Sequence, residues 1–407
     1  MKTICFVVPQ FPTVSQTFIV NQIVAAKKQG YAVCVLASKL GTLEQSSQGK
    51  LLEQYQLLKD TIVIDYQIPK TKLKQLMVGL GLILKYFKFW IQPVPVTIKH
   101  RVLNWPFLLQ FYAQLKHIEV FHVQFALGGV AIAEMKANGL LKAKLITTFH
   151  GHDAHFQNKN VLQHLQNNYK VLFKASNYVT VNTPFLEAQV LELGCKQETL
   201  KVVPMAIDVA YFKSDIIKEL PSQGDVKLIS VGRLIEIKGF AYAIEAIKLL
   251  IDKGVYVHYT IVGEGELYKS LQDQIEVLEL NNHVTLVGKK NQEEIRSALH
   301  SHHIYLMSSV TNSKGRCETQ GLVTAEAQAM GLPVVAFNNG GIPYTIRDGE
   351  TGVLVPEKDV TSYANAILEL INHPKRYQNM SQQAREFAVN NFSNQLMMER
   401  FSALYEN

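Results

Sequence analysis

Residues 227–240 read KLISVGRLIEIKGF, a β-branched run that ends in a glycine-containing loop and continues into a helical pattern. A strand, a short loop and a helix form the repeating unit of a parallel sheet. The unit recurs in both halves of the chain, where short apolar runs alternate with longer segments of helical periodicity. The sequence therefore predicts an α/β protein with two doubly wound domains of similar size.

The expected strands fall into two blocks. In the first block we expect strands at residues 3–8, 32–37, 61–65, 120–123, 144–149 and 178–181. In the second block we expect them at residues 227–231, 257–262, 284–287, 304–307, 333–337 and 352–355. Helices lie between the strands, for example at 15–29 and 161–174, and residues 203–224 lack a clear period, which is typical of a junction.

Length and composition narrow the class of protein. The chain has 407 residues, of which 47% are hydrophobic and 18% charged, so it can bury a large core. No run approaches the roughly 18–20 apolar residues that a membrane-spanning helix needs. The four cysteines have no metal-ligand spacing, and the opening residues are typical of a first strand rather than a signal peptide. These features favour a protein of the reducing cytoplasm whose cysteines are free thiols.

The net charge of +7 is concentrated between Asp65 and Glu119, where the sequence has no acidic residue. Basic side chains alternate there with LMVGLGLIL (residues 76–84) and YFKFW (residues 86–90). The pattern of residues 70–101 favours a helix that lies on an anionic bilayer surface. The alternative interpretation is a core helix with a basic, solvated edge. No recognised module for binding nucleic acid accompanies this segment.

The segment ETQGLVTAE, residues 318–326, places two carboxylates around an expected helix start. Glu318 would lie in the loop before the helix and Glu326 in its second turn. The backbone N–H groups of Gly321, Leu322 and Val323 can hold a phosphate at the helix N-terminus. Carboxylates beside such a site accept hydrogen bonds from sugar hydroxyls, but they could equally be favourable first-turn charges without a ligand.

Two cations follow the strand at 227–231. Arg233 and Lys238 lie on one strand-to-helix loop and can clamp a diphosphate, although two solvated bases are the commoner outcome. GEGELY, residues 263–268, lacks the third glycine of a dinucleotide fingerprint and is weak evidence for NAD. Neither half has an Asp-x-Asp triplet or a metal-ligand cluster, so we expect no metal cofactor.

In the first half, the strand at 144–149 runs into His150, with Asp153 placed to orient that histidine. A histidine at the carboxyl end of a strand can contact a ligand, although packing or capping is the alternative. Ser15 and Thr17 follow the opening strand and can cap the next helix or contact a ligand.

Together these segments resemble the retaining nucleotide-sugar glycosyltransferases of family 4, which have the GT-B architecture of two Rossmann-like domains. The similarity covers nearly the whole chain. It rests on FPxxS-x-TF, T-x-HGxD, VGRL-x-x-x-KG, VGEG, E-x₇-E, GLPVVA and GG-I-P with DG-x-TG, in that order. The resemblance implies an acceptor domain at 1–205, a donor domain at 206–390 and a last helix, within 391–407, that crosses back to the first domain.

The resemblance also implies roles for particular residues. Arg233 and Lys238 would hold the donor diphosphate, Glu318 the donor-sugar hydroxyls, Glu326 the ribose, and residues 321–323 the distal phosphate. The base would stack near Gly288 and Lys289, in the turn after the strand that ends at Val287. Gly263 of the VGEG turn is a further donor-binding candidate. His150 would lie beside the donor sugar. The acceptor-side candidates are Ser15, Gln16, Thr17, Gln124 and Asp153.

The chain departs from the family pattern mainly on the acceptor side. Gln16 stands where the family often has Glu, and Gln124 where it often has His. Thr319, Gln320 and Tyr344 also differ from the usual residues.

The resemblance as a whole implies a metal-independent hexosyltransferase that uses a nucleotide-sugar, with UDP favoured over GDP. We expect this enzyme to extend a lipid-linked or cell-surface glycan at the inner face of the membrane. The alternatives are a soluble transferase with a small acceptor, a nucleotide-sugar epimerase or phosphorylase, and a catalytically silent subunit.

Overall fold

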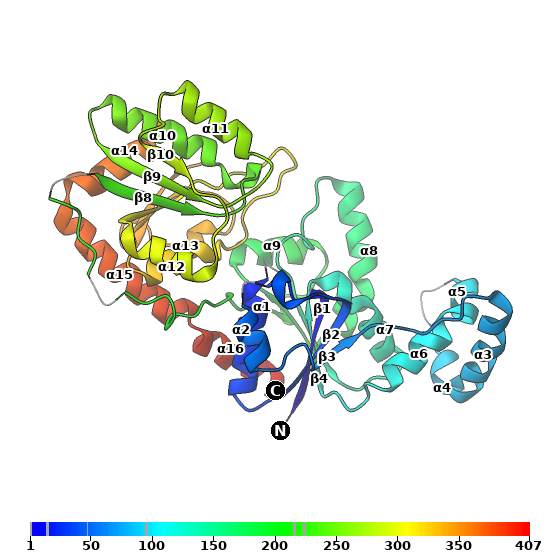
Figure 1. Cartoon of the computed structure of the whole chain (residues 1–407). Coiled ribbons are helices and arrows are strands. Elements are labelled where there is room, and N and C mark those ends of the chain that lie inside the picture. The colour runs from blue at the N-terminus through cyan, green and yellow to red at the C-terminus, as the bar shows by residue number, and fades with distance from the viewer. Residues whose placement is uncertain (1, 14–15, 47, 94–96, 215–216, 223–224) are drawn as a thin grey trace. The chain divides into compact units, whose positions relative to one another are not determined.

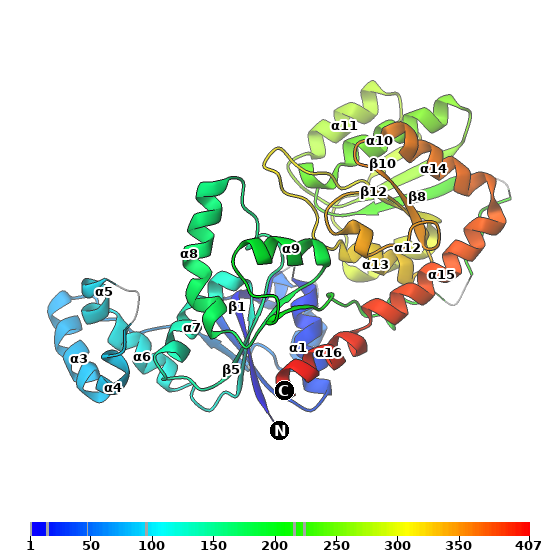
Figure 2. The ribbon, with the colours of Figure 1, turned by 180° about the vertical axis from the view of Figure 1, so that it is seen from behind.

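The computed structural model describes residues 2–13, 16–46, 48–93, 97–214, 217–222 and 225–407, and the chain forms two compact units (Figures 1 and 2). The first unit comprises Met1–Val181, Leu186–Val203 and Met398–Asn407. The second comprises Asn182–Phe185 and Pro204–Met397. Each unit is built on one parallel sheet, as the sequence predicts.

The sheet of the first unit has the order β3-β2-β1-β4-β5-β6-β7 with every pairing parallel. Its strands are β1 (Thr3–Phe11), β2 (Ala32–Leu40), β3 (Thr61–Val63), β4 (Val120–Gln124), β5 (Lys144–Thr148), β6 (Tyr178–Val181) and β7 (Leu200–Val202). The helices in this half of the chain are α1 (Thr17–Lys28), α2 (Gly49–Gln54), α3 (Lys72–Lys85), α4 (Phe87–Trp90), α5 (Ile98–Leu103), α6 (Trp105–Ala113), α7 (Val130–Ala137), α8 (Lys159–Ala175) and α9 (Pro184–Glu192). The sequence pattern does not predict β7, because its three residues are too few to show a period.

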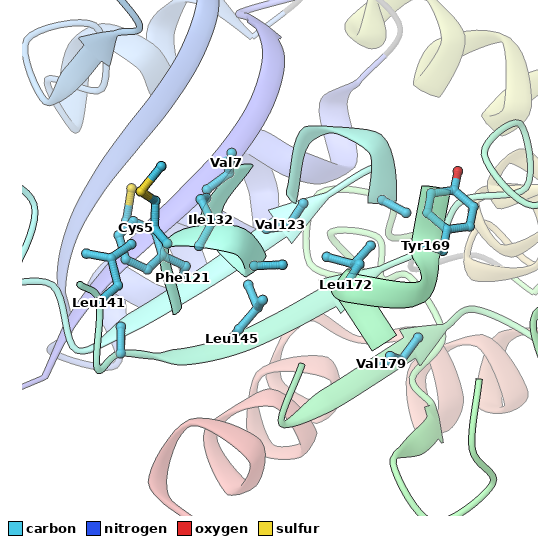
Figure 3. Close-up of a cluster of buried hydrophobic side chains, with 14 of the residues drawn as sticks. Cys5, Val7, Phe121, Val123, Ile132, Leu141, Leu145, Tyr169, Leu172 and Val179 are labelled. Carbon is cyan, nitrogen blue, oxygen red and sulfur yellow. The ribbon is translucent and has the colours of Figure 1, made fainter. Parts of the chain in front are cut away.

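The core of the first unit lies between the sheet and its helices. Every residue of β4 is buried, as expected for a central strand covered on both faces. Figure 3 shows side chains from β1, β4 and β5 packed with Leu172 and Tyr169 of α8. Asn158 is the N-cap of the amphipathic helix α8, and its side chain accepts hydrogen bonds from two backbone N–H groups of the first turn.

The second unit repeats the design with the sheet order β10-β9-β8-β11-β12-β13, again with every pairing parallel. Its strands are β8 (Val226–Val231), β9 (Val257–Val262), β10 (Val284–Leu286), β11 (Ile304–Met307), β12 (Val334–Asn338) and β13 (Gly352–Pro356). Its helices are α10 (Phe240–Asp252), α11 (Tyr268–Val277), α12 (Gln292–Ser301), α13 (Leu322–Ala329), α14 (Val360–Asn372) and α15 (Pro374–Phe392).

The last helix, α16 (Asn394–Glu406), ends within the first unit, to which Met398–Asn407 belong. Lys2 and Lys144 hold its C-terminus: Lys2 Nζ donates to the Tyr405 carbonyl at 2.9 Å, and Lys144 Nζ donates to the Leu404 carbonyl at 3.1 Å. Cations at a helix C-terminus satisfy its last carbonyls and complement its dipole. The final turn of α16 is therefore bonded to the residue that precedes β1 and to the first residue of β5.

The chain between β3 and β4 forms a group of short helices, α3 to α6, instead of the single crossover helix usual in such sheets. α3 packs on α5 and α6, and Figures 1 and 2 show α3, α4 and α5 beyond α6, away from the sheet. Among the described residues, no helix is long and apolar enough to cross a membrane.

Candidate active site

Three loops meet at the carboxyl edge of the second sheet. The N–H of Gly232, after β8, donates to the Val262 carbonyl at 2.9 Å, and the N–H of Gly263, after β9, donates to the Gly288 carbonyl at 2.9 Å. A Cβ on Gly263 would lie 1.8 Å from the Gly232 carbonyl oxygen, and φ of Gly263 is +153°. Only glycine permits this approach. The contact brings the loop of Arg233 beside Gly263 and Gly288, while Lys289 Nζ lies 3.5 Å from a Glu264 carboxylate oxygen.

Lys238 and Glu318 are 80 residues apart in sequence and form an ion pair in the structure, with 2.5 Å between Lys238 Nζ and Glu318 Oε2. Their side chains are 16% and 20% exposed. Burial alone would raise the pKa of Glu318, but the neighbouring Lys238 and Arg233 hold it below its ordinary value. Glu318 is therefore a carboxylate at neutral pH, and Arg233 and Lys238 both favour this charged form.

Helix α13 starts where the sequence analysis expected. Gly321 is its N-cap, in a left-handed conformation with φ of +71°, and Leu322 and Val323 open the first turn. The first backbone N–H groups of a helix lack partners within the helix and carry the positive end of its dipole. Residues 321–323 thus provide donors for an anion, close in sequence to Glu318.

Glu326 lies in the second turn of α13 and has a different environment from Glu318. No hydrogen bond or ion pair is found for its carboxyl group among the described residues, and burial raises its pKa to about 8. At neutral pH this group is mostly protonated. A neutral carboxyl group can donate as well as accept a hydrogen bond, which suits a hydroxyl-bearing ligand.

In the first unit, Gln124 and His150 lie at the ends of β4 and β5. His150 Nε2 is 2.8 Å from Gln124 Oε1, and burial lowers the pKa of His150 to about 3. The hydrogen bonds described for the Asp153 carboxylate all come from backbone N–H groups. Its Oδ1 accepts from the backbone N–H groups of His150 and Gly151, each at 3.0 Å, so Asp153 shapes the loop that carries His150. Gln124 itself is fully buried.

The remaining acceptor-side candidates lie around the start of α1. Ser15 lies outside the described residues. Gln16 is the N-cap of α1 but makes no side-chain capping hydrogen bond, and Thr17 is the first helical residue rather than a cap. The expectation that Thr17 caps the helix was wrong, because the cap position falls one residue earlier.

The glycines of GG-I-P, which have no predicted role in the site, support the Glu318 loop. The Gly341 N–H donates to the Glu318 carbonyl at 2.7 Å, and a Cβ on Gly341 would lie 1.8 Å from the Thr319 carbonyl oxygen. On the other side, Gln320 pairs through both ends of its amide with the backbone of Met205, at 3.0 and 2.9 Å. Two adjacent glycines after a strand were the signal for this close backbone contact.

His122 and Tyr405 were also missed. His122 Nδ1 lies 2.7 Å from the Tyr405 hydroxyl, and both side chains are fully buried. The available signal was the position of His122 two residues before Gln124, because alternate residues of a strand face the same side of the sheet.

Comparison with known proteins agrees with this arrangement. Residues 15–211 match the family described as Glycosyltransferase Family 4, and residues 212–387 match Glycosyl transferases group 1. The amylovoran biosynthesis glycosyltransferase AmsK of Erwinia amylovora is 30% identical over 90% of this chain and 89% of its own length. WcaL of Salmonella typhimurium, named for colanic acid biosynthesis, is 28% identical over 99% of both chains.

Among solved structures, Anabaena HepE in complex with UDP superposes with a TM-score of 0.75 at 18% identity and covers 100% of both chains. That likeness identifies the fold as GT-B. The candidate site lies at the edge of the sheet where parallel α/β domains bind ligands. The loops and the helix at this edge carry Arg233, Lys238, Glu318 and Glu326. This chain belongs to the family 4, group 1 glycosyltransferases.

Proposed function

We propose that the protein is a retaining glycosyltransferase that moves a sugar from a UDP-sugar to a lipid-linked or cell-surface glycan during polysaccharide assembly. The observation that carries the proposal is the Lys238–Glu318 ion pair beside Arg233 and the N-terminus of α13. Cations and helix donors suit the diphosphate, and a buried carboxylate suits the sugar hydroxyls. UDP is favoured because it is the nucleotide bound in the HepE structure.

The proposed chemistry uses the charge that develops on the leaving nucleotide. As the glycosidic bond breaks, negative charge accumulates on the diphosphate, where Arg233, Lys238 and residues 321–323 would stabilise it without a metal. Glu318 is held by Lys238, so we propose that it binds sugar hydroxyls while a donor phosphate oxygen takes the acceptor proton. Gly288 and Lys289 would border the base, and Glu326 the ribose.

A thermal-shift panel with UDP, GDP, ADP, CMP and NAD, in the presence of EDTA, tests the donor assignment. A specific ligand at about 100 times its Kd adds roughly 2.7 kcal/mol to the free energy of unfolding. We expect the shift with UDP, and we expect Arg233→Ala to abolish it. A shift with NAD alone would overturn the proposal, and a shift that needs a divalent cation would overturn metal independence.

We further propose that the enzyme works at the cytoplasmic face of the membrane and that α3, α4 and α5 dock it there. Exposed apolar side chains recur along one face of α3 at i, i+4, i+7 and i+11: Leu73 (72%), Met77 (67%), Leu80 (52%) and Leu84 (78%). Exposed lysines occur within α3 and in the residues near it in sequence: Lys70, Lys72, Lys74, Lys85, Lys88 and Lys99. An apolar stripe bordered by cations is the pattern of a helix lying in an anionic lipid interface.

Arg101, by contrast, serves the structure of this helical group. It donates to the carbonyls of Trp90 and Gln92, at 2.7 and 2.9 Å, and stacks on the Trp90 ring. It is therefore a poor position at which to test lipid binding.

Flotation with vesicles of phosphatidylcholine, with and without phosphatidylglycerol, tests the docking proposal. Changing Leu73, Met77 and Leu84 to Gln, or neutralising Lys70, Lys72 and Lys74, should release the protein from anionic vesicles. The matched control neutralises three exposed lysines of the second unit, Lys253, Lys269 and Lys375. Equal flotation of all variants would contradict the membrane assignment and favour a soluble enzyme with a small acceptor.

A further inference from the structure

Cys5 and Cys34 occupy paired positions on neighbouring strands of the first sheet. β1 and β2 run parallel, and their register pairs Cys5 with Cys34, so both side chains project from the same face. Neighbouring strands lie about 4.8 Å apart, which is within the Cα separation of about 4.4–6.8 Å that a disulfide spans. The register therefore brings two free thiols within reach of a covalent bond.

The two thiols also form a hydrogen bond with each other. This bond lowers the pKa of Cys34, against the opposing effects of burial and of the Asp60 carboxylate. Burial raises the pKa of Cys5 well above its ordinary value. The pair therefore favours one arrangement, in which the Cys5 S–H donates to a Cys34 thiolate.

The two cysteines differ in their access to solvent. Cys5 is fully buried in the core of the first unit, where Figure 3 shows its side chain. Cys34 packs against the same core but is partly exposed. Oxidants react with thiolates rather than thiols, and they react first with cysteines that solvent can reach. Cys34 combines both properties, and Cys5 is a second thiol held beside it.

The other two cysteines of the chain have different surroundings. Burial raises the pKa of Cys195, whose hydrogen-bond partners are oxygen atoms rather than a second sulfur. Burial, together with the neighbouring carboxylates of Glu318 and Glu357, raises the pKa of Cys317 to about 11. Both thiols are therefore protonated at neutral pH and react slowly with oxidants.

We propose that Cys5 and Cys34 form an oxidative modification site, at which a hydroperoxide oxidises Cys34 to a sulfenic acid and Cys5 then closes a disulfide between β1 and β2. This reaction uses no group of the candidate active site, so the proposal does not rest on the proposed function. A disulfide also protects Cys34 from oxidation to the sulfinic and sulfonic acids, which thiols do not reverse.

The reaction has two steps. In the first, the Cys34 sulfur attacks one oxygen of hydrogen peroxide, the O–O bond breaks, and the other oxygen takes a proton and leaves as water. In the second, the Cys5 sulfur attacks the Cys34 sulfur, the S–O bond breaks, and the Cys5 proton leaves with that oxygen as a second water. The two cysteines together lose two electrons, and the peroxide is reduced to water.

Thiol counting and peptide mapping of the full chain test the proposal. The reduced protein is treated with hydrogen peroxide, and free thiols are counted after denaturation, with and without dithiothreitol. We expect the four free thiols to fall to two and to return to four with dithiothreitol. Mapping of the oxidised protein should find Cys5 joined to Cys34 in the same chain. A count that stays at four, or a disulfide between any other pair, overturns the proposal.

Two substitutions test the separate roles of the two thiols. Cys5→Ser keeps a hydrogen-bond donor beside Cys34 but cannot form a disulfide, so the sulfenic acid should persist on Cys34 and react with dimedone. Cys34→Ser should keep its three remaining thiols under the same treatment. The matched control is Cys195→Ala, which removes another buried thiol of the first unit and should still lose two thiols.

The same experiments distinguish an oxidation site from simple packing. If the two cysteines serve only as small apolar side chains of the core, the wild type and Cys5→Ser lose no thiols and Cys34 gives no dimedone adduct. That result overturns the proposal, and so does oxidation that begins at Cys195 or Cys317. The wild-type count and map decide the matter even if a variant fails to fold.

Discussion

Lys238 Nζ and Glu318 Oε2 lie 2.5 Å apart at the carboxyl edge of the second sheet, and each side chain compensates the charge of the other. Two charges in a site that is only 16–20% exposed are tolerated because they are paired. The pair therefore links the stability of the second unit to the same groups that would bind the donor.

Lys238→Met should lower turnover at least 100-fold, because one of the charges opposite the leaving diphosphate is lost. It should also cost roughly 2 kcal/mol of unfolding free energy at pH 7, because the Glu318 carboxylate is left buried and unpaired. In the wild type, the lowered pKa of Glu318 contributes stability above about pH 4.5 that is lost as the pH falls. The difference between variant and wild type in urea unfolding should therefore shrink at low pH.

The control for that experiment is Lys248→Met, which breaks an exposed i,i+4 pair with Asp252 at the same 2.5 Å separation. Exposed pairs contribute little, so stability and turnover should stay close to those of the wild type. Wild-type turnover in Lys238→Met would contradict the assigned site.

Glu326→Gln should change how stability depends on pH. Burial raises the pKa of Glu326 from 4.5 to about 8, so the folded protein holds a proton that the unfolded chain releases. The stability from this group is complete below about pH 4.5 and declines as the pH rises through 8. The variant should thus gain roughly 1–3 kcal/mol relative to the wild type between pH 5 and pH 9 in urea unfolding. The control is Glu266→Gln, at an exposed position in the same unit, which should show no such trend. If the pH dependence of unfolding free energy is the same in Glu326→Gln as in the wild type, the Glu326 carboxyl group is in contact with water.

Gly341→Ala should displace the Glu318 loop by steric contact. Gly341 has φ of −87°, which alanine adopts freely, so the effect comes from a Cβ 1.8 Å from the Thr319 carbonyl oxygen. We expect a loss above about 2 kcal/mol in unfolding free energy together with a large loss of turnover. Gly81→Ala, where an added Cβ meets nothing within 4 Å, should be neutral or slightly stabilising. Equal behaviour of the two variants would show that the GG-I-P contact is not required.

Tyr405→Phe should destabilise the first unit. The substitution removes the hydroxyl 2.7 Å from His122 Nδ1 and leaves a buried ring nitrogen without its partner, which costs about 1–3 kcal/mol. Tyr31→Phe, which removes a hydroxyl from an exposed contact with Glu406, is the matched control and should change little. An unfolding curve of Tyr405→Phe that matches the wild type would argue against a role for the last turn of α16.

Local sequence patterns were sufficient to predict most of the strands and helices. Strand runs such as 257–262 and 304–307 coincide with β9 and β11, and the helix expected to begin near Gly321 has this glycine as its N-cap. These features depend on side-chain periodicity and backbone freedom within a few residues. The three-residue strand β7 lies below the length at which periodicity can be detected.

The sequence by itself determined the two parallel sheets, the loops that carry Arg233, Lys238 and Glu318, and the membership in a glycosyltransferase family, because each is written in short motifs. The tertiary structure alone decided which charges pair, why Glu318 is ionised while Glu326 is protonated, and that Gln124 is hydrogen-bonded to His150. Those properties depend on burial and on partners tens to hundreds of residues away, which local sequence patterns do not encode.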